Sequence, residues 1–140
     1  MNFMIVADSS ANIFRVDGLN YTTVPMKIIA GDKEFVDTPA LDLNGMVTFL
    51  KGHKGKSGSS CANAQEWLEA FEGADYAFGV TISKNLSGSY NAAQQAANDF
   101  MEENPGTATA VAKAVIPVAV PVEAAVVAMS QAAGVSIDAA

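Results

Sequence analysis

The chain has 140 residues, of which 50% are hydrophobic and 16% charged, a composition typical of one globular domain rather than of a disordered segment. Its formal net charge of −7 disfavours nucleic acid as a partner, because phosphate binding needs clustered lysine and arginine, and it also disfavours an anionic membrane surface. The single cysteine, Cys61, excludes an internal disulfide and suits a reducing compartment.

The N-terminus predicts a buried strand rather than a targeting segment. Residues 3–7 are continuously apolar and no basic region precedes them, so we expect a cytoplasmic protein without a signal peptide. Asp8 and Ser9 end this run. Ligands of open α/β sheets gather at the carboxyl ends of the strands, which makes both residues candidates for ligand contacts. The alternative is that they only satisfy turn and helix-start amides.

The next segment predicts a β-hairpin. Residues 21–29 are mostly β-branched or apolar, residues 30–33 turn the chain, and residues 34–37 return. Pro25 lacks a backbone N–H and therefore indicates the edge or the entrance of a sheet.

A helix is predicted over residues 44–50, and a basic, glycine-rich loop over residues 51–58 follows it. Residues 55–57 imitate the end of a phosphate-binding P-loop. However, Leu50 stands where that motif needs glycine, and a helix rather than a strand precedes it, so the sequence does not favour an ATP site. His53, the only histidine, has no metal-ligand pattern around it, and we predict no metal.

The first of two hydroxyl-rich segments contains Ser59 and Ser60. A helix is expected directly after it, because Asn63 and Glu66 have the spacing of a capping box. Cys61 lies between the serines and this cap. No base or orienting carboxylate accompanies it in the sequence, so we interpret it as a packing or lining residue rather than a nucleophile.

The second hydroxyl-rich segment follows a predicted strand over residues 76–80. Ser87, Gly88 and Ser89 fall where a helix begins, and that helix should continue to about Glu103. A helix start offers unpaired N–H groups and the positive end of the helix dipole. Gly88 allows a ligand to approach the backbone, and the hydroxyls can donate hydrogen bonds, so this segment can hold an anion.

The composition changes at residue 107. We therefore divide the chain into a domain over residues 1–106 and an alanine- and valine-rich continuation of the same domain over residues 107–140. A strand near residues 111–116 and a helix near residues 122–133 are expected there. Two prolines and a lysine interrupt the segment, which argues against a membrane span.

The serine segments and Asp8 are expected to face one crevice at the carboxyl edge of the sheet. Neutral donors at helix starts suit a carboxylate or a phosphate. Since the sequence places no general base, metal cluster or activated nucleophile beside them, binding is favoured over catalysis and no cofactor is expected. The alternative is that these serines are ordinary helix caps.

The pattern resembles the N-terminal half of the DegV family, the bacterial fatty-acid-binding proteins that serve fatty acid kinase. The similarity extends over about residues 3–106. Its matching pieces, in order, are residues 6–10, 24–29, 59–63 with Glu66 and Trp67 following, and 81–90, of which the last is the most specific.

The resemblance implies an α/β fold shared with dihydroxyacetone kinase subunits, in which a layered sheet carries helices on both faces. It implies one N-terminal domain, without the second domain that the family has. It further implies a long-chain fatty acid whose carboxylate contacts Ser59 and Ser60 on one segment and Ser87, Gly88 and Ser89 on the other. A fatty acid kinase would phosphorylate the bound lipid, so the chain itself would be a carrier and not an enzyme.

Two alternatives remain open. One is a small-molecule kinase or transferase subunit, suggested by the shared fold. The other is a truncated domain that no longer binds a ligand. Without a covering second domain, apolar surface is expected to be exposed and to favour association with other molecules.

Overall fold

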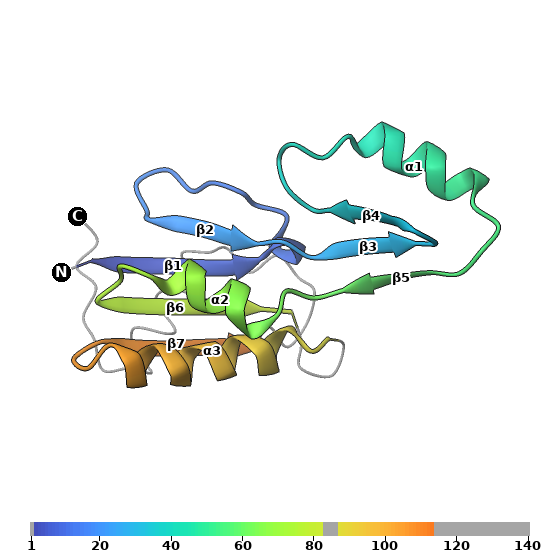
Figure 1. Ribbon diagram of the computed structural model, residues 1–140. Helices are drawn as coiled ribbons and strands as arrows, with labels where there is room; N and C mark the ends of the chain where they lie inside the picture. Colours follow the sequence, from blue (N-terminus) through green and yellow to red (C-terminus); the bar gives the residue numbers. More distant parts are fainter. Residues whose placement is uncertain (1, 83–86, 114–140) are drawn as a thin grey trace.

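The computed structural model describes residues 2–82 and 87–113, which form a parallel sheet and a smaller antiparallel sheet (Figure 1). The strands are β1 (Phe3–Asp8), β2 (Tyr21–Val24), β3 (Lys27–Ala30), β4 (Lys33–Val36), β5 (Ser57–Ser60), β6 (Tyr76–Thr81) and β7 (Ala108–Lys113). The helices are α1 (Leu43–Gly52), α2 (Ala64–Phe71) and α3 (Ser89–Glu103), and a short 3-10 turn, η1 (Ser9–Ala11), follows β1.

The larger sheet has the order β2–β1–β6–β7, and its three strand pairs are all parallel. Parallel neighbours need crossover connections, which α3 supplies between β6 and β7. β1 and β6, both predicted as apolar strands, occupy the centre of this sheet. The α/β class predicted from the sequence is confirmed.

The main core lies between this sheet and the pair α2 and α3, which pack against one another on one face (Figure 1). Trp67 and Phe71 of α2 and Phe100 of α3 are buried there against Val6 and Ala77 of the sheet. The helix predicted near residues 122–133 and the end of the strand predicted near residues 111–116 lie outside the described residues.

The smaller sheet has the order β4–β3–β5, with antiparallel pairing throughout. The hairpin of β3 and β4 was predicted, and Gly31 turns it with a φ of 63°. Two details differ from the sequence prediction. The run over residues 21–29 is interrupted at Pro25 and contributes strands to both sheets, because proline cannot continue a hydrogen-bonded ladder. Ser57 and Gly58, predicted as loop, belong to β5.

Local signals place the helix starts well. The capping box of α2 is present, with Asn63 Oδ1 accepting from the Glu66 N–H at 2.9 Å and Glu66 Oε2 accepting from the Asn63 N–H at 2.9 Å. α3 begins at Ser89, with Gly88 as its N-cap residue. The longest of the described helices has 15 residues, and none is long and apolar enough to cross a membrane.

Candidate ligand-binding site

The Asp8 carboxylate organises the carboxyl edge of the parallel sheet. It is 1% exposed, and its Oδ2 accepts hydrogen bonds at 2.9 Å from the Ile82 N–H and from the Ser89 hydroxyl. Its Oδ1 accepts from both the N–H, at 3.2 Å, and the hydroxyl of Ser10. One buried side chain thus joins the ends of β1 and β6 to the first turn of α3.

Ser9 connects the two sheets. It is 2% exposed, and its hydroxyl oxygen accepts a hydrogen bond at 2.9 Å from the Met26 N–H, in the two-residue link between β2 and β3. Asp8 and Ser9 therefore lie at the predicted sheet edge, with contacts to protein groups that fix the surrounding backbone.

Ser59 and Ser60 face opposite sides of the small sheet. Neighbouring residues of a strand alternate in direction, and Ser59 pairs with Ile28 while Ser60 pairs with Lys27. The Ser60 hydroxyl donates a hydrogen bond of 3.3 Å to the Cys61 carbonyl. Ser59 is exposed and lines one cavity with Leu43 and Met46 of α1, so it lies on the face of the small sheet that α1 covers. Figure 1 shows α1 beside this sheet. A sequence pattern does not reveal this divergence, because the segment was predicted as loop.

The two serine segments approach one another at Cys61 and Gly88. A Cβ atom placed on Gly88 would lie 3.5 Å from Cys61 Sγ, so glycine brings the backbone at the start of α3 to within contact of the first segment. The Ser87 hydroxyl oxygen accepts a hydrogen bond of 3.2 Å from the Ser89 N–H. This leaves the Ser87 O–H able to donate, whereas the Ser89 O–H is donated to Asp8.

A cavity of about 300 Å³ lies between α1 and the small sheet, with Ser59 of the first serine segment in its wall. Most of its walls are apolar or carry hydroxyl groups, supplied by Ser10, Met26, Ile28, Phe35, Leu41, Leu43, Met46 and Ser59, with Lys27 and Asp37 also among its lining residues. Its volume is at the lower end of the range of about 300–1,000 Å³ that small-molecule sites occupy. The sequence does not reveal this cavity, because it forms only where α1 lies over the small sheet.

The cavity and the serine segments are connected through Asp8. Ser10, whose N–H and hydroxyl contact Asp8, lines the cavity, and Ser89 contacts the other oxygen of the same carboxylate. The phenol of Tyr21 is also near: burial and, to a smaller extent, the negative charge of Asp8 raise its pKa above the ordinary value. Its O–H donates a hydrogen bond of 2.7 Å to the Ile13 carbonyl.

His53 does not take part in this site. It stacks on Phe49, with ring centroids 5.5 Å apart, and lies next to Gly31 at the end of the small sheet opposite to Ser60. Within the described residues, no group of three or more histidine, cysteine, aspartate or glutamate side chains is arranged to hold a metal ion.

Comparison with known proteins identifies the family. The model described as "Uncharacterised protein, DegV family" matches residues 2–136. The chain belongs to the DegV family. A DegV domain-containing protein of Streptococcus pneumoniae is 36% identical over 111 residues, which are 76% of this chain and 40% of that protein. This chain therefore spans less than half the length of that DegV relative.

Two solved structures share the fold, with TM-scores above 0.8. A DegV family protein from Eubacterium eligens, loaded with heptadecanoic acid, has a TM-score of 0.83 and 31% identity over 96% of this chain and 49% of its own. The Fatty Acid Kinase (Fak) B3 protein of Streptococcus pneumoniae, loaded with linoleic acid, has a TM-score of 0.81 and 31% identity over 97% of this chain and 50% of its own. The present chain corresponds to one domain of these larger proteins.

Proposed function

We propose that this DegV chain binds a long-chain fatty acid, with the acyl chain in the cavity under α1 and the carboxylate between Ser59 and the start of α3. The observation that carries the proposal is the apolar cavity that has hydroxyl groups in its wall. An acyl chain gains about 0.8 kcal/mol for each methylene removed from water, so an apolar cavity favours it over polar small molecules.

Neutral donors are available for the carboxylate. Ser59 contributes a hydroxyl at the cavity, and Ser87 contributes a hydroxyl whose oxygen accepts from the Ser89 N–H and whose proton can donate to a carboxylate. The first turn of a helix adds backbone N–H groups and the positive end of the dipole. We assign Asp8, Ser9 and Ser89 to the support of this arrangement, because their side chains already make hydrogen bonds to protein groups: the Ser89 hydroxyl donates to Asp8, and the Ser9 hydroxyl oxygen accepts from the Met26 N–H.

The two similar structures loaded with fatty acids support this ligand class for the present chain. The name of the second of them suggests a fatty acid kinase as the partner to which the lipid is presented. In this proposal the chain carries the lipid and does not itself perform a reaction.

Alanine variants of Ser59, Ser60 and Ser87 test where the carboxylate binds. We expect Ser59→Ala and Ser87→Ala each to weaken oleate binding about tenfold, the loss of one hydrogen bond to a charged group. Ser60→Ala should weaken it less than twofold, because this side chain points to the opposite face of the sheet. Titration followed by the fluorescence of Trp67, the only tryptophan, measures the affinities.

The reverse result, in which Ser60→Ala weakens binding and Ser59→Ala does not, would place the carboxylate on the Lys27 face of the small sheet. Ser57→Ala serves as the control, because Ser57 lies on the same strand two residues from Ser59 and does not line the cavity.

A further inference from the structure

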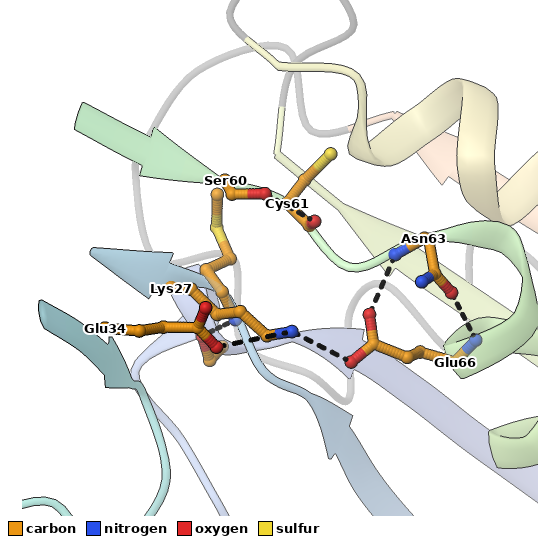
Figure 2. Close-up of polar contacts among 8 residues, drawn as sticks. Lys27, Glu34, Ser60, Cys61, Asn63 and Glu66 are labelled. Atoms are coloured by element: carbon orange, nitrogen blue, oxygen red, sulfur yellow. Dashed lines mark hydrogen bonds and ion pairs between the residues drawn. The ribbon is translucent and has the colours of Figure 1, made fainter. Parts of the chain in front are cut away.

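An ionic contact joins the small sheet to the first turn of α2 (Figure 2). Lys27 Nζ lies 3.6 Å from Glu66 Oε1 and 3.8 Å from Glu34 Oε1. The second oxygen of Glu66, Oε2, accepts the hydrogen bond from the Asn63 N–H at 2.9 Å. The Glu66 carboxylate therefore contacts β3 on one side and the N-cap residue of α2 on the other.

These contacts close a ring around the segment from Ser60 to Asn63. Ser60 pairs with Lys27 across the small sheet, which fixes the beginning of the segment to β3. Asn63 is held at the end of the segment by both halves of the capping box. Because Lys27 also contacts Glu66, the two ends of this short connection are tied together.

Within the ring, Cys61 is the residue that meets the second serine segment. Its side chain points away from Lys27 and Glu66 (Figure 2), and its Sγ would lie 3.5 Å from a Cβ atom at Gly88. Any shift of the ring therefore changes the spacing between Ser59 and the start of α3, which is the spacing that a carboxylate would have to bridge.

We propose that Lys27 and Glu66 are positioning residues of the fatty-acid site: their ion pair sets the distance between the two serine segments. This inference rests on the proposed function. Lys27 is among the residues that line the cavity, but neither residue is assigned a contact with the carboxylate. Their side chains are 27% and 29% exposed, and ion pairs of this kind add little to global stability. Their loss should therefore change the local spacing more than the unfolding transition.

Two variants separate the ion pair from the helix cap. Lys27→Met removes the ammonium and keeps the aliphatic stem. Glu66→Gln removes the charge but leaves an acceptor at the third position of the capping box, where glutamine serves as well as glutamate. Both should weaken oleate binding about three- to fivefold, the scale of a partly exposed ion pair. Lys27→Arg should restore the affinity.

The reactivity of Cys61 reports the spacing directly, without a ligand. Since Cys61 is the only cysteine and is half-buried beside Gly88, its rate of alkylation by a maleimide measures how closely the two segments approach. We expect Lys27→Met and Glu66→Gln to raise this rate several-fold, with melting temperatures close to those of the controls.

Two matched controls make the same chemical changes nearby. Lys33→Met alters a lysine of β4 whose Nζ lies 5.8 Å from the centre of the Phe49 ring, outside the ionic ring. Glu34→Gln removes the other carboxylate near Lys27 and leaves the contact to Glu66. Neither should change the alkylation rate or the affinity for oleate more than twofold.

Alkylation rates that stay unchanged in Lys27→Met and Glu66→Gln, or that rise equally in the controls, overturn the positioning role even if oleate binds. Faster alkylation with unchanged oleate affinity overturns it as well. If the unsubstituted chain binds no oleate, the proposed function fails, and the ring is then only a structural contact.

Discussion

Replacing Asp8 by alanine is expected to lower the free energy of unfolding by about 3–5 kcal/mol, because the buried Ser89 hydroxyl and several partly buried donors lose their common acceptor at about 1–3 kcal/mol each. The donors are the backbone N–H groups of Ser10 and Ile82 and the hydroxyls of Ser10 and Ser89. Urea denaturation followed by the fluorescence of Trp67, which is 0% exposed, measures the change.

Asp8→Asn is the companion variant. An asparagine oxygen at the position of Oδ2 keeps the acceptor for Ile82 and Ser89, while the amide nitrogen faces the Ser10 N–H and cannot accept from it. We expect a smaller loss, about 1–2 kcal/mol.

Asp17→Ala is the control for both variants, since the Asp17 side chain is 85% exposed in its ion pair with Arg15, and it should change stability by less than about 0.5 kcal/mol. A loss below about 1 kcal/mol for Asp8→Ala would contradict the role given to this carboxylate.

Filling the cavity should abolish lipid binding without unfolding the protein. Ile28→Trp places a large ring among the lining residues under α1, in space that an acyl chain would occupy. If four methylenes are displaced at about 0.8 kcal/mol each, oleate binding weakens by about 3 kcal/mol, which is more than a hundredfold. Isothermal titration calorimetry measures this loss, and its heat-capacity change reports the apolar area that is buried.

The adjacent residue provides the matched control. Ile29 is on the same strand, points to the opposite face and is 40% exposed, and it does not line the cavity. Ile29→Trp should therefore leave the affinity within about twofold of the original. Equal effects of the two substitutions would show that the acyl chain lies elsewhere.

Much of the fold could be predicted because its signals are local. The apolar runs of β1 and β6, the capping box at Asn63 and the helical period of α3 each depend on residues close together in the chain. The rule that ligands gather at the carboxyl edge of a parallel sheet also predicted that Asp8 and Ser89, which are 81 residues apart, lie in the same region.

The parts that could not be predicted depend on distant partners. β5 consists of serine and glycine, which do not favour strands, and it is a strand because β3 offers its backbone groups to it. Only that pairing shows that Ser59 and Ser60 point in opposite directions. The cavity likewise needs α1 to lie over the small sheet, and no local pattern encodes that placement.

The most direct test of fatty-acid binding is native mass spectrometry of this chain mixed with oleate, with oleyl alcohol in a parallel sample. The proposal predicts one oleate per chain. It also predicts much weaker retention of the alcohol, which has a hydrocarbon chain of the same length and no carboxylate. Absence of an oleate complex, or equal retention of the two lipids, would contradict it.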